Sequence, residues 1–235
     1  MTNREKYILS IYEELSDMGK HENVKLVKNT VNDGIYIKKT LKNYNIEIYK
    51  ILKNRQIKGI PKVYEIIEDE KELIIIEEYI HGLTLDKKYN KTDVETVKKI
   101  MEQLCNILKQ LHNMNPPIIH RDIKPTNIIV SNDDVVYLVD FNISREYDEN
   151  QSVDTVIMET QGYASPEQCG FAQTDCRSDI YSIGMLMKNI LMVDEYPDKE
   201  TKRLKRIIDK CISIDPEKRY KNIEKLEQAL NNKLG

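Results

Sequence analysis

Short runs of β-branched and other apolar residues, separated by turn residues, fill much of the first 80 positions of the chain. Such runs predict strands, and together they predict a small five-stranded antiparallel sheet. The clearest strands are expected at residues 24–27, 34–39, 63–67 and 73–76. Residues 4–15 instead space their apolar side chains for one face of a helix, and a second short helix is expected around Ile46 to Leu52.

Beyond residue 90 the apolar positions follow the period of amphipathic helices. Thr92–Glu95 has the form of a capping box, and the helix that it opens should end before Pro116-Pro117. Two more amphipathic helices are expected at roughly 199–212 and 217–232. Strands followed by helices indicate an α+β protein with a small sheet and a mainly helical remainder.

Polar side chains suited to phosphoryl transfer lie between the helix that ends before Pro116-Pro117 and the two C-terminal helices. Asp122 can accept the proton of an attacking hydroxyl, and Lys124, two positions on in an extended loop, points the same way. Asn127 and Asp140 offer the hard oxygen ligands that Mg²⁺ prefers. Residues 128–130 and 135–139 predict a β-hairpin, which would return the chain and place Asp140 beside Asn127.

These residues lie in two motifs, His120-Arg121-Asp122-Ile123-Lys124-Pro125-Thr126-Asn127 and Asp140-Phe141-Asn142. The chain thereby resembles the eukaryotic-type (Hanks-type) serine/threonine protein kinases, whose catalytic loop is H-R-D-x-K-x-x-N and whose metal motif is D-F-G. The resemblance implies one bilobal kinase domain over residues 1–235, with an N-lobe at about 1–80, a hinge at about 77–83 and a C-lobe at about 84–235. It also implies that ATP binds between the lobes.

The resemblance assigns roles to the residues of the two motifs. Asp122, Lys124, Asn127 and Thr160 would be catalytic, and Asn127 and Asp140 would hold Mg²⁺, with Mn²⁺ as an alternative. Thr160, in a segment similar to the family's G-T-x-x-Y-x-[AS]-P-E, would hydrogen-bond Asp122 and Lys124. The third position of the metal motif is Asn142 in place of glycine, a residue that also tolerates left-handed backbone angles.

The ATP-binding lysine should lie on the strand that follows the Asn32-Asp33-Gly34 turn, where Lys38 and Lys39 are adjacent. Strand periodicity places Lys39 on the apolar face and Lys38 on the solvent face, so Lys39 is the better candidate. Val24 would close the glycine-rich loop, of which Gly19 is the glycine that remains. Side chains in the other glycine positions should loosen the grip on ATP phosphates.

Two glutamates compete as the partner of Lys39. Kinases pair this lysine with a glutamate on the following helix, and Glu47 is the acid in that position. Glu77 occupies the gatekeeper position, where a buried carboxylate is costly unless it is paired, so it could supplement or replace Glu47. The residues after it, Glu78, Tyr79 and Ile80, resemble the hinge that binds the nucleotide.

Three further charged residues would stabilise the large lobe. Glu167 would pair with Arg219, and Asp179 would hold the backbone of the catalytic loop. Residues 143–159 resemble an activation loop, in which Ser152 or Thr155 is the expected phosphorylation site. A phosphate there could dock on Arg121.

The amino-acid composition restricts the binding partners and the cellular location that we expect. Hydrophobic residues make up 40% and charged residues 32%, with a net charge of −3 that gives no basis for nucleic-acid or anionic-membrane binding. No signal peptide or membrane-spanning run is apparent, and the four cysteines lack C-x-x-C spacing, as expected of reduced thiols in a cytoplasmic protein. Abundant Lys, Ile and Asn without Trp suggest a bacterial source, and the oligomeric state is left open.

The expected partners are therefore ATP and protein substrates. Lys124 and Ser165-Pro166-Glu167 disfavour a small-molecule phosphotransferase, and the residues after Asp122 do not follow the tyrosine-kinase pattern. The first hypothesis is an active kinase that phosphorylates Ser and Thr hydroxyls, including its own. The alternative is a pseudokinase that acts as a nucleotide-binding or protein-binding scaffold, suggested by the missing glycines, Asn142, Glu77 and the short helix of Glu47.

Overall fold

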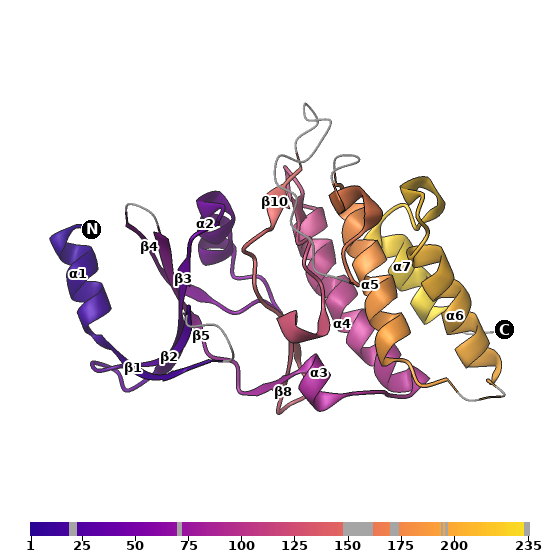
Figure 1. Ribbon diagram of the computed structural model, residues 1–235, viewed down its shortest axis with the longest axis horizontal. Coiled ribbons are helices and arrows are strands. Elements are labelled where there is room, and N and C mark those ends of the chain that lie inside the picture. Colours follow the sequence, from indigo (N-terminus) through magenta and orange to yellow (C-terminus); the bar gives the residue numbers. More distant parts are fainter. Residues whose placement is uncertain are drawn as a thin grey trace. The chain divides into compact units, whose positions relative to one another are not determined.

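The computed structural model describes residues 1–18, 23–69, 72–147, 162–169, 174–193, 195 and 197–232. The chain divides into two compact units, Met1–His81 and Gly82–Gly235. The boundary falls inside the segment 77–83 that the sequence indicates as a hinge. Figure 1 colours the first unit from indigo to purple and the second from magenta to yellow.

The first unit contains the predicted five-stranded antiparallel sheet, in the order β1-β2-β3-β5-β4. Its strands are β1 (Tyr12–Asp17), β2 (Val24–Asn29), β3 (Ile35–Leu41), β4 (Val63–Asp69) and β5 (Glu72–Glu78). Alternate residues of β3, namely Ile37, Lys39 and Leu41, are buried. β5 lies between β3 and β4, so its backbone is paired on both sides.

The first helix is shorter than its apolar spacing predicted. α1 (Asn3–Ser10) begins at a capping box between Thr2 and Glu5, and the chain enters β1 at Tyr12. Tyr12 pairs with Asn29 of β2, and its ring packs edge-on against Tyr36 at 5.6 Å between centroids. Strand pairing and this aromatic contact stabilise the extended conformation over a further helical turn.

Helix α2 (Ile46–Arg55) follows β3 as expected, and Asn45 caps it by accepting a hydrogen bond from the backbone N–H of Glu47. The helix buries Ile48, Tyr49 and Leu52 and packs on β4. Its polar residues remain on the opposite, solvent-facing side, the usual arrangement for an amphipathic helix on a sheet.

The second unit is mainly helical. Its helices are α3 (Leu85–Lys88), α4 (Val94–His112), α5 (Cys176–Ile190), α6 (Lys199–Cys211) and α7 (Ile223–Asn231). Helix α5 packs on α6, and α4 packs on α7 and α5, so these four lie side by side (Figure 1). Single turns of 3₁₀-helix occur at η1 (Pro125–Asn127), η2 (Pro166–Cys169) and η3 (Pro216–Lys218).

Two helix starts differ from the sequence prediction because other residues cap them. Asp93 caps α4 by accepting a hydrogen bond from the Thr96 N–H, so the helix starts one residue later than the Thr92 capping box implies. α7 starts at Ile223 instead of 217, since Asn222 accepts from the Lys225 N–H. A short polar side chain that satisfies a free N–H defines a helix start.

Short strands complete the second unit. β6 (Gly82–Thr84), β8 (Ile128–Ser131) and β9 (Val136–Leu138) form a three-stranded sheet, and β7 (Ile118–Ile119) pairs with β10 (Arg145–Glu146). The β8–β9 pair is the predicted hairpin. Within the described residues, no helix is long and apolar enough to cross a bilayer.

Candidate active site

The catalytic loop between β7 and β8 holds three polar side chains together. The Lys124 Nζ lies 2.8 Å from the Asp122 Oδ2, and the Asn127 Nδ2 donates to the same oxygen at 2.8 Å and to the Asp122 carbonyl at 3.0 Å. Asn127 is buried and ends η1, directly before the hairpin, whereas the Asp122 side chain keeps 11% of its surface exposed. The structure therefore gathers the predicted groups around a carboxylate that solvent can still reach.

Asp179, on the first turns of α5, fixes the backbone that precedes Asp122. Its fully buried carboxylate accepts from the N–H of His120 at 2.9 Å and from the N–H of Arg121 at 2.8 Å. The predicted role of Asp179 is thereby confirmed as a contact. Arg121 has a φ of 69°, a left-handed conformation that these bonds help to hold.

The sequence interpretation missed the partner of Asp179 on α4. The His112 Nε2 lies 2.9 Å from the Asp179 Oδ2. Burial alone would lower the pKa of His112, but the bond to Asp179 raises it to about 10. Burial would raise the pKa of Asp179, yet His112 holds it below its usual value, so the two directions agree in favouring the charged forms of both groups. The sequence does contain a signal for this contact, because His112 lies four positions after Leu108 and is therefore a polar residue on the apolar face of the helix.

The β8–β9 hairpin returns the chain to the catalytic loop as predicted. The Val139 N–H donates to the Asn127 carbonyl at 2.9 Å, so Asp140 follows directly on a residue bonded to Asn127. Asp140 takes the left-handed conformation at φ 68°, the role expected of Asn142. Phe141 packs edge-on against His120 at 4.7 Å between ring centroids, and burial lowers the pKa of His120.

Asp140 and Asn127 fit a bound divalent cation. The Asp140 Oδ1 is buried and has no hydrogen-bond partner among the described residues. The amide nitrogen of Asn127 is engaged by Asp122, which leaves its amide oxygen to act as a ligand. A buried carboxylate oxygen without a donor is costly, and a cation would satisfy it.

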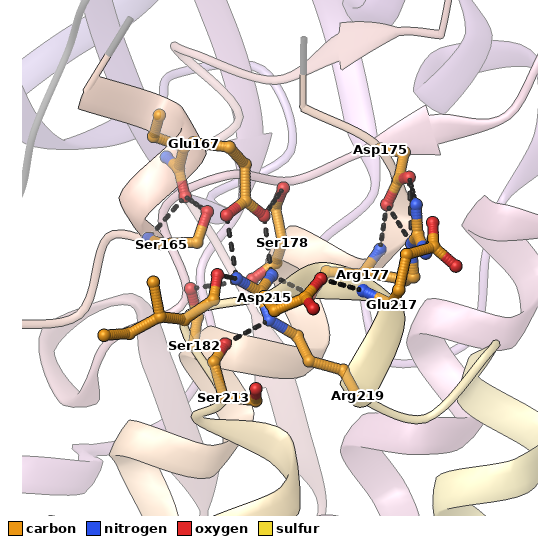
Figure 2. A network of polar contacts seen from close by, with 12 residues as sticks. Ser165, Glu167, Asp175, Arg177, Ser178, Ser182, Ser213, Asp215, Glu217 and Arg219 are labelled. Atoms are coloured by element: carbon orange, nitrogen blue, oxygen red, sulfur yellow. Dashed lines mark hydrogen bonds and ion pairs between the residues drawn. The ribbon is translucent and has the colours of Figure 1, made fainter. Parts of the chain in front are cut away.

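Glu167 and Arg219 form the predicted buried ion pair of the second unit (Figure 2). The Arg219 Nη1 and Nη2 donate to the two carboxylate oxygens at 2.6 and 2.8 Å. Ser178 on α5 donates to Glu167 as well, at 2.9 Å. Although burial would raise the pKa of Glu167, Arg219 lowers it. The pair ties η2 to the segment after η3 and to α5.

A second contact near η2 was not predicted. The Gln168 Nε2 donates to the Arg121 carbonyl at 2.8 Å, and its Oε1 accepts from the N–H and hydroxyl of Ser165. The catalytic-loop backbone is thus bonded from η2 as well as from α5. An uncharged glutamine beside the Ser-Pro-Glu sequence gave no indication of this role.

In the first unit, Lys39 pairs with Glu77. The Lys39 Nζ lies 2.6 Å from the Glu77 Oε1, and their side chains are only 9% and 10% exposed. Lys38 faces the other way and contacts the surface residue Glu14 at 2.9 Å. The choice of Lys39 over Lys38 as the buried lysine is confirmed, and so is the predicted contact with Glu77.

Glu47 does not take the place that the resemblance gave it. Its side chain is 59% exposed and lies 2.8 Å from the Lys50 Nζ, one turn along α2. The buried side of α2 is formed by Ile48, Tyr49 and Leu52, which turns Glu47 toward solvent. Its expected pairing with Lys39 is therefore wrong in this structure.

The remaining predicted nucleotide contacts lie at the ends of strands. Val24 opens β2 and is the register partner of Lys39. Glu78 closes β5 and accepts from the Lys62 N–H at 3.1 Å, Tyr79 packs on His81, and Ile80 is buried. Gly19, Ser152, Thr155 and Thr160 lie outside the described residues.

The catalytic loop with Asp140 in the second unit and the buried Lys39–Glu77 pair in the first unit are each arrangements that the protein kinase motifs of the sequence lead one to expect. A family model for the protein kinase domain matches residues 16–232, and the chain belongs to the protein kinase family. The α+β fold class is confirmed with it. Members of this family use ATP and a divalent metal ion.

Curated relatives include bacterial serine/threonine protein kinases, as the sequence led us to expect. The chain is 30% identical over 200 residues to the probable serine/threonine-protein kinase of Clostridium acetobutylicum, covering 74% of this chain and 30% of that protein. It is 29% identical over 197 residues to serine/threonine-protein kinase D of Synechocystis, covering 74% and 38%. Against serine/threonine-protein kinase PknB of Mycobacterium tuberculosis it is 35% identical over 121 residues, covering 50% and 19%. The chain thus spans roughly a third of the first two relatives.

Proposed function

We propose that the chain is an active serine/threonine protein kinase whose two units together make one catalytic domain. It transfers the γ-phosphoryl group of ATP to Ser and Thr hydroxyls of protein substrates, and of its own chain. The observation that carries this proposal is the carboxylate of Asp122, which receives both Lys124 and Asn127 at 2.8 Å. The similarity to serine/threonine kinases supports the choice of acceptor.

Each retained side chain has a chemical task. Asp122 orients the acceptor hydroxyl and takes its proton as the oxygen attacks. Lys124 neutralises charge that develops on the transferred phosphoryl group. Lys39 binds the α- and β-phosphates of ATP, and the peptide at Glu78–Ile80 contacts the base. Thr160 orients Asp122 and Lys124, as the resemblance implies.

Asp140 and Asn127 would hold the metal ion, and Mg²⁺ suits their hard oxygen atoms, as would Mn²⁺. A bound metal ion supplies positive charge that offsets the charge of the phosphates. Asn127 has a second task, since its amide holds the Asp122 carboxylate in place.

The described thiols Cys105, Cys176 and Cys211 are unpaired with one another, which supports a reducing, cytoplasmic setting.

The scaffold alternative lacks support of comparable weight. It rested on the missing loop glycines, Asn142, Glu77 and the short helix of Glu47, but Glu77 is the buried partner of Lys39. A protein that only binds partners has no physical need to hold Asp122, Lys124 and Asn127 within hydrogen-bonding distance. Buried polar groups of this kind are costly to keep unless they have a task.

Incorporation of label from γ-labelled ATP with Mg²⁺ tests the proposal. Wild type, Asp122→Asn and Asp133→Asn are compared with peptide libraries that contain only Ser, Thr or Tyr as acceptor. Asp133 is an exposed residue of the β8–β9 turn, so Asp133→Asn is a matched control for the same chemical change. We expect Ser and Thr labelling by wild type and the control, and loss of at least about 10²-fold in Asp122→Asn.

Two results would contradict the proposal. Labelling that survives in Asp122→Asn would remove Asp122 from the reaction. The absence of labelling in wild type, with ATP binding intact by calorimetry, would favour the scaffold.

A further inference from the structure

The Lys39–Glu77 pair follows from strand register. β3 and β5 pair Ile37 with Glu77 and Lys39 with Ile75, so Lys39 and Glu77 are diagonal neighbours on the same face. Diagonal neighbours lie about 7–8 Å apart, which two long side chains can bridge. The resulting contact of 2.6 Å between Nζ and Oε1 needs no element outside the sheet.

The surroundings of the pair make its two members depend on each other. Glu77 also pairs with Val63 of β4, so the carboxylate lies over a central strand with neighbours on both sides. Its register partners Ile37 and Val63, and Ile75, which is the register partner of Lys39, are all buried apolar residues. An ionised group in such a place is retained only when a partner of opposite charge compensates it.

Helix α2 holds its glutamate, Glu47, on its exposed face. Ile48 and Leu52 are four residues apart and form the buried face with Tyr49, while Glu47 and Lys50 form an exposed pair one turn apart. Glu47 would have to leave this exposed face to approach Lys39. Its present pair is of the solvent-exposed kind that contributes little to stability.

We infer that Glu77, and not Glu47, is the positioning residue for Lys39. The ATP-binding lysine is then held by the register of one β-sheet instead of by the docking of helix α2. A displacement of α2 would leave the Lys39–Glu77 contact in place, so control of this kinase does not act by breaking it through α2. The role of Lys39 toward ATP rests on the proposed function.

Calorimetric titration with Mg²⁺–ATP tests this inference without requiring phosphoryl transfer. The variants are Glu77→Gln, Glu47→Gln and, as a matched control on β4, Glu65→Gln. Loss of the charge of Glu77 from this buried ion pair predicts at least about tenfold weaker ATP binding in Glu77→Gln. Glu47→Gln and Glu65→Gln, which alter partly exposed pairs, should change the affinity less than about twofold.

Steady-state kinetics and thermal unfolding separate positioning from folding. Glu77→Gln should raise KM for ATP while KM for the peptide acceptor stays unchanged, a split that general loss of structure would not produce. Should Glu77→Gln fail to fold, Glu77→Asp keeps the charge with one methylene less. It is expected to weaken ATP binding more than Glu65→Gln does.

The outcomes distinguish this inference from the proposed function. The inference would be overturned if Glu47→Gln lost ATP affinity while Glu77→Gln kept it. It would also be overturned if the wild type bound ATP and both variants bound it with unchanged affinity. ATP binding that depends on Glu77 in a wild type without kinase activity would support the inference and refute the proposed function.

Discussion

Replacing Arg219 with methionine should destabilise the second unit strongly, because it leaves a buried carboxylate without its cation. The Arg219 side chain has no exposed surface, and that of Glu167 keeps 7%. Besides the two bonds to Glu167, Arg219 donates to the carbonyls of Ser213 at 2.8 Å, Arg177 at 3.0 Å and Ile214 at 3.3 Å. Figure 2 shows these bonds converging on one guanidinium group.

The magnitude follows from this burial. Removing one partner of a buried ion pair costs about 3–5 kcal/mol. In a protein of this size each kcal/mol lowers Tm by about 2–4 °C, so Arg219→Met should unfold about 6–20 °C below wild type. Ser178, which donates to Glu167 at 2.9 Å, compensates the stranded charge only in part.

Thermal and denaturant unfolding monitored by circular dichroism measures the effect. Lys218→Met is the matched control, since Lys218 is 76% exposed and its substitution should change stability by no more than about 0.5 kcal/mol. The double variant Arg219→Met/Glu167→Leu should be more stable than Arg219→Met alone, because no charge remains unpaired. A free energy of unfolding of Arg219→Met within about 1 kcal/mol of the wild-type value would refute the reasoning.

Acidification gives an independent check. The pKa of Glu167 is lowered from 4.5 in the folded state, so the pair stabilises the protein above that value. This contribution is lost as the pH falls through the lowered pKa. The stability difference between wild type and Arg219→Met should therefore be constant near neutral pH and shrink in acid. A difference that grows in acid would contradict the assignment.

Two further predictions concern α4 and α5. The pKa of His112 is raised to about 10 by Asp179, so its stabilising contribution is complete below pH 6.5 and lost as the pH rises through about 10. The free energy of unfolding of wild type should therefore fall between pH 6.5 and about pH 10. His112→Gln should lack this decline. A Cβ on Gly184 would lie 2.5 Å from the Cβ of Cys211 and 2.7 Å from the Cγ2 of Ile212. Gly184→Ala should therefore cost about 1–3 kcal/mol in denaturant unfolding, despite the higher helix propensity of alanine, and an unchanged midpoint would show that α5 and α6 can separate freely.

The short-range features of this protein could be predicted from its sequence. The turn between residues 131 and 134 and its flanking β-branched runs predict the hairpin that places Asp140 after Val139, bonded to Asn127. Alternation along β3 predicts that Lys39 is buried and Lys38 is not. These features depend on neighbours within a few residues, where backbone geometry leaves few alternatives.

Resemblance added contacts between distant residues that no local pattern indicates. The pairs Glu167–Arg219 and Asp179 with the backbone of residues 120 and 121 are present as expected. The same reasoning failed at Glu47, because the family's pairing assumes a helix that points its glutamate at the lysine. Here α2 presents Ile48, Tyr49 and Leu52 to the protein and leaves Glu47 outside.

The sequence by itself thus determined four of the five strands of the first sheet, the β8–β9 hairpin, the catalytic loop and the face of β3 on which Lys39 lies, since each depends on local periodicity and spacing. Only the tertiary structure decided that Glu77 meets Lys39, that His112 meets Asp179, and that Tyr12 leaves the first helix for a strand. Those outcomes depend on sheet register and helix packing, where residues far apart in the chain compete for the same partner.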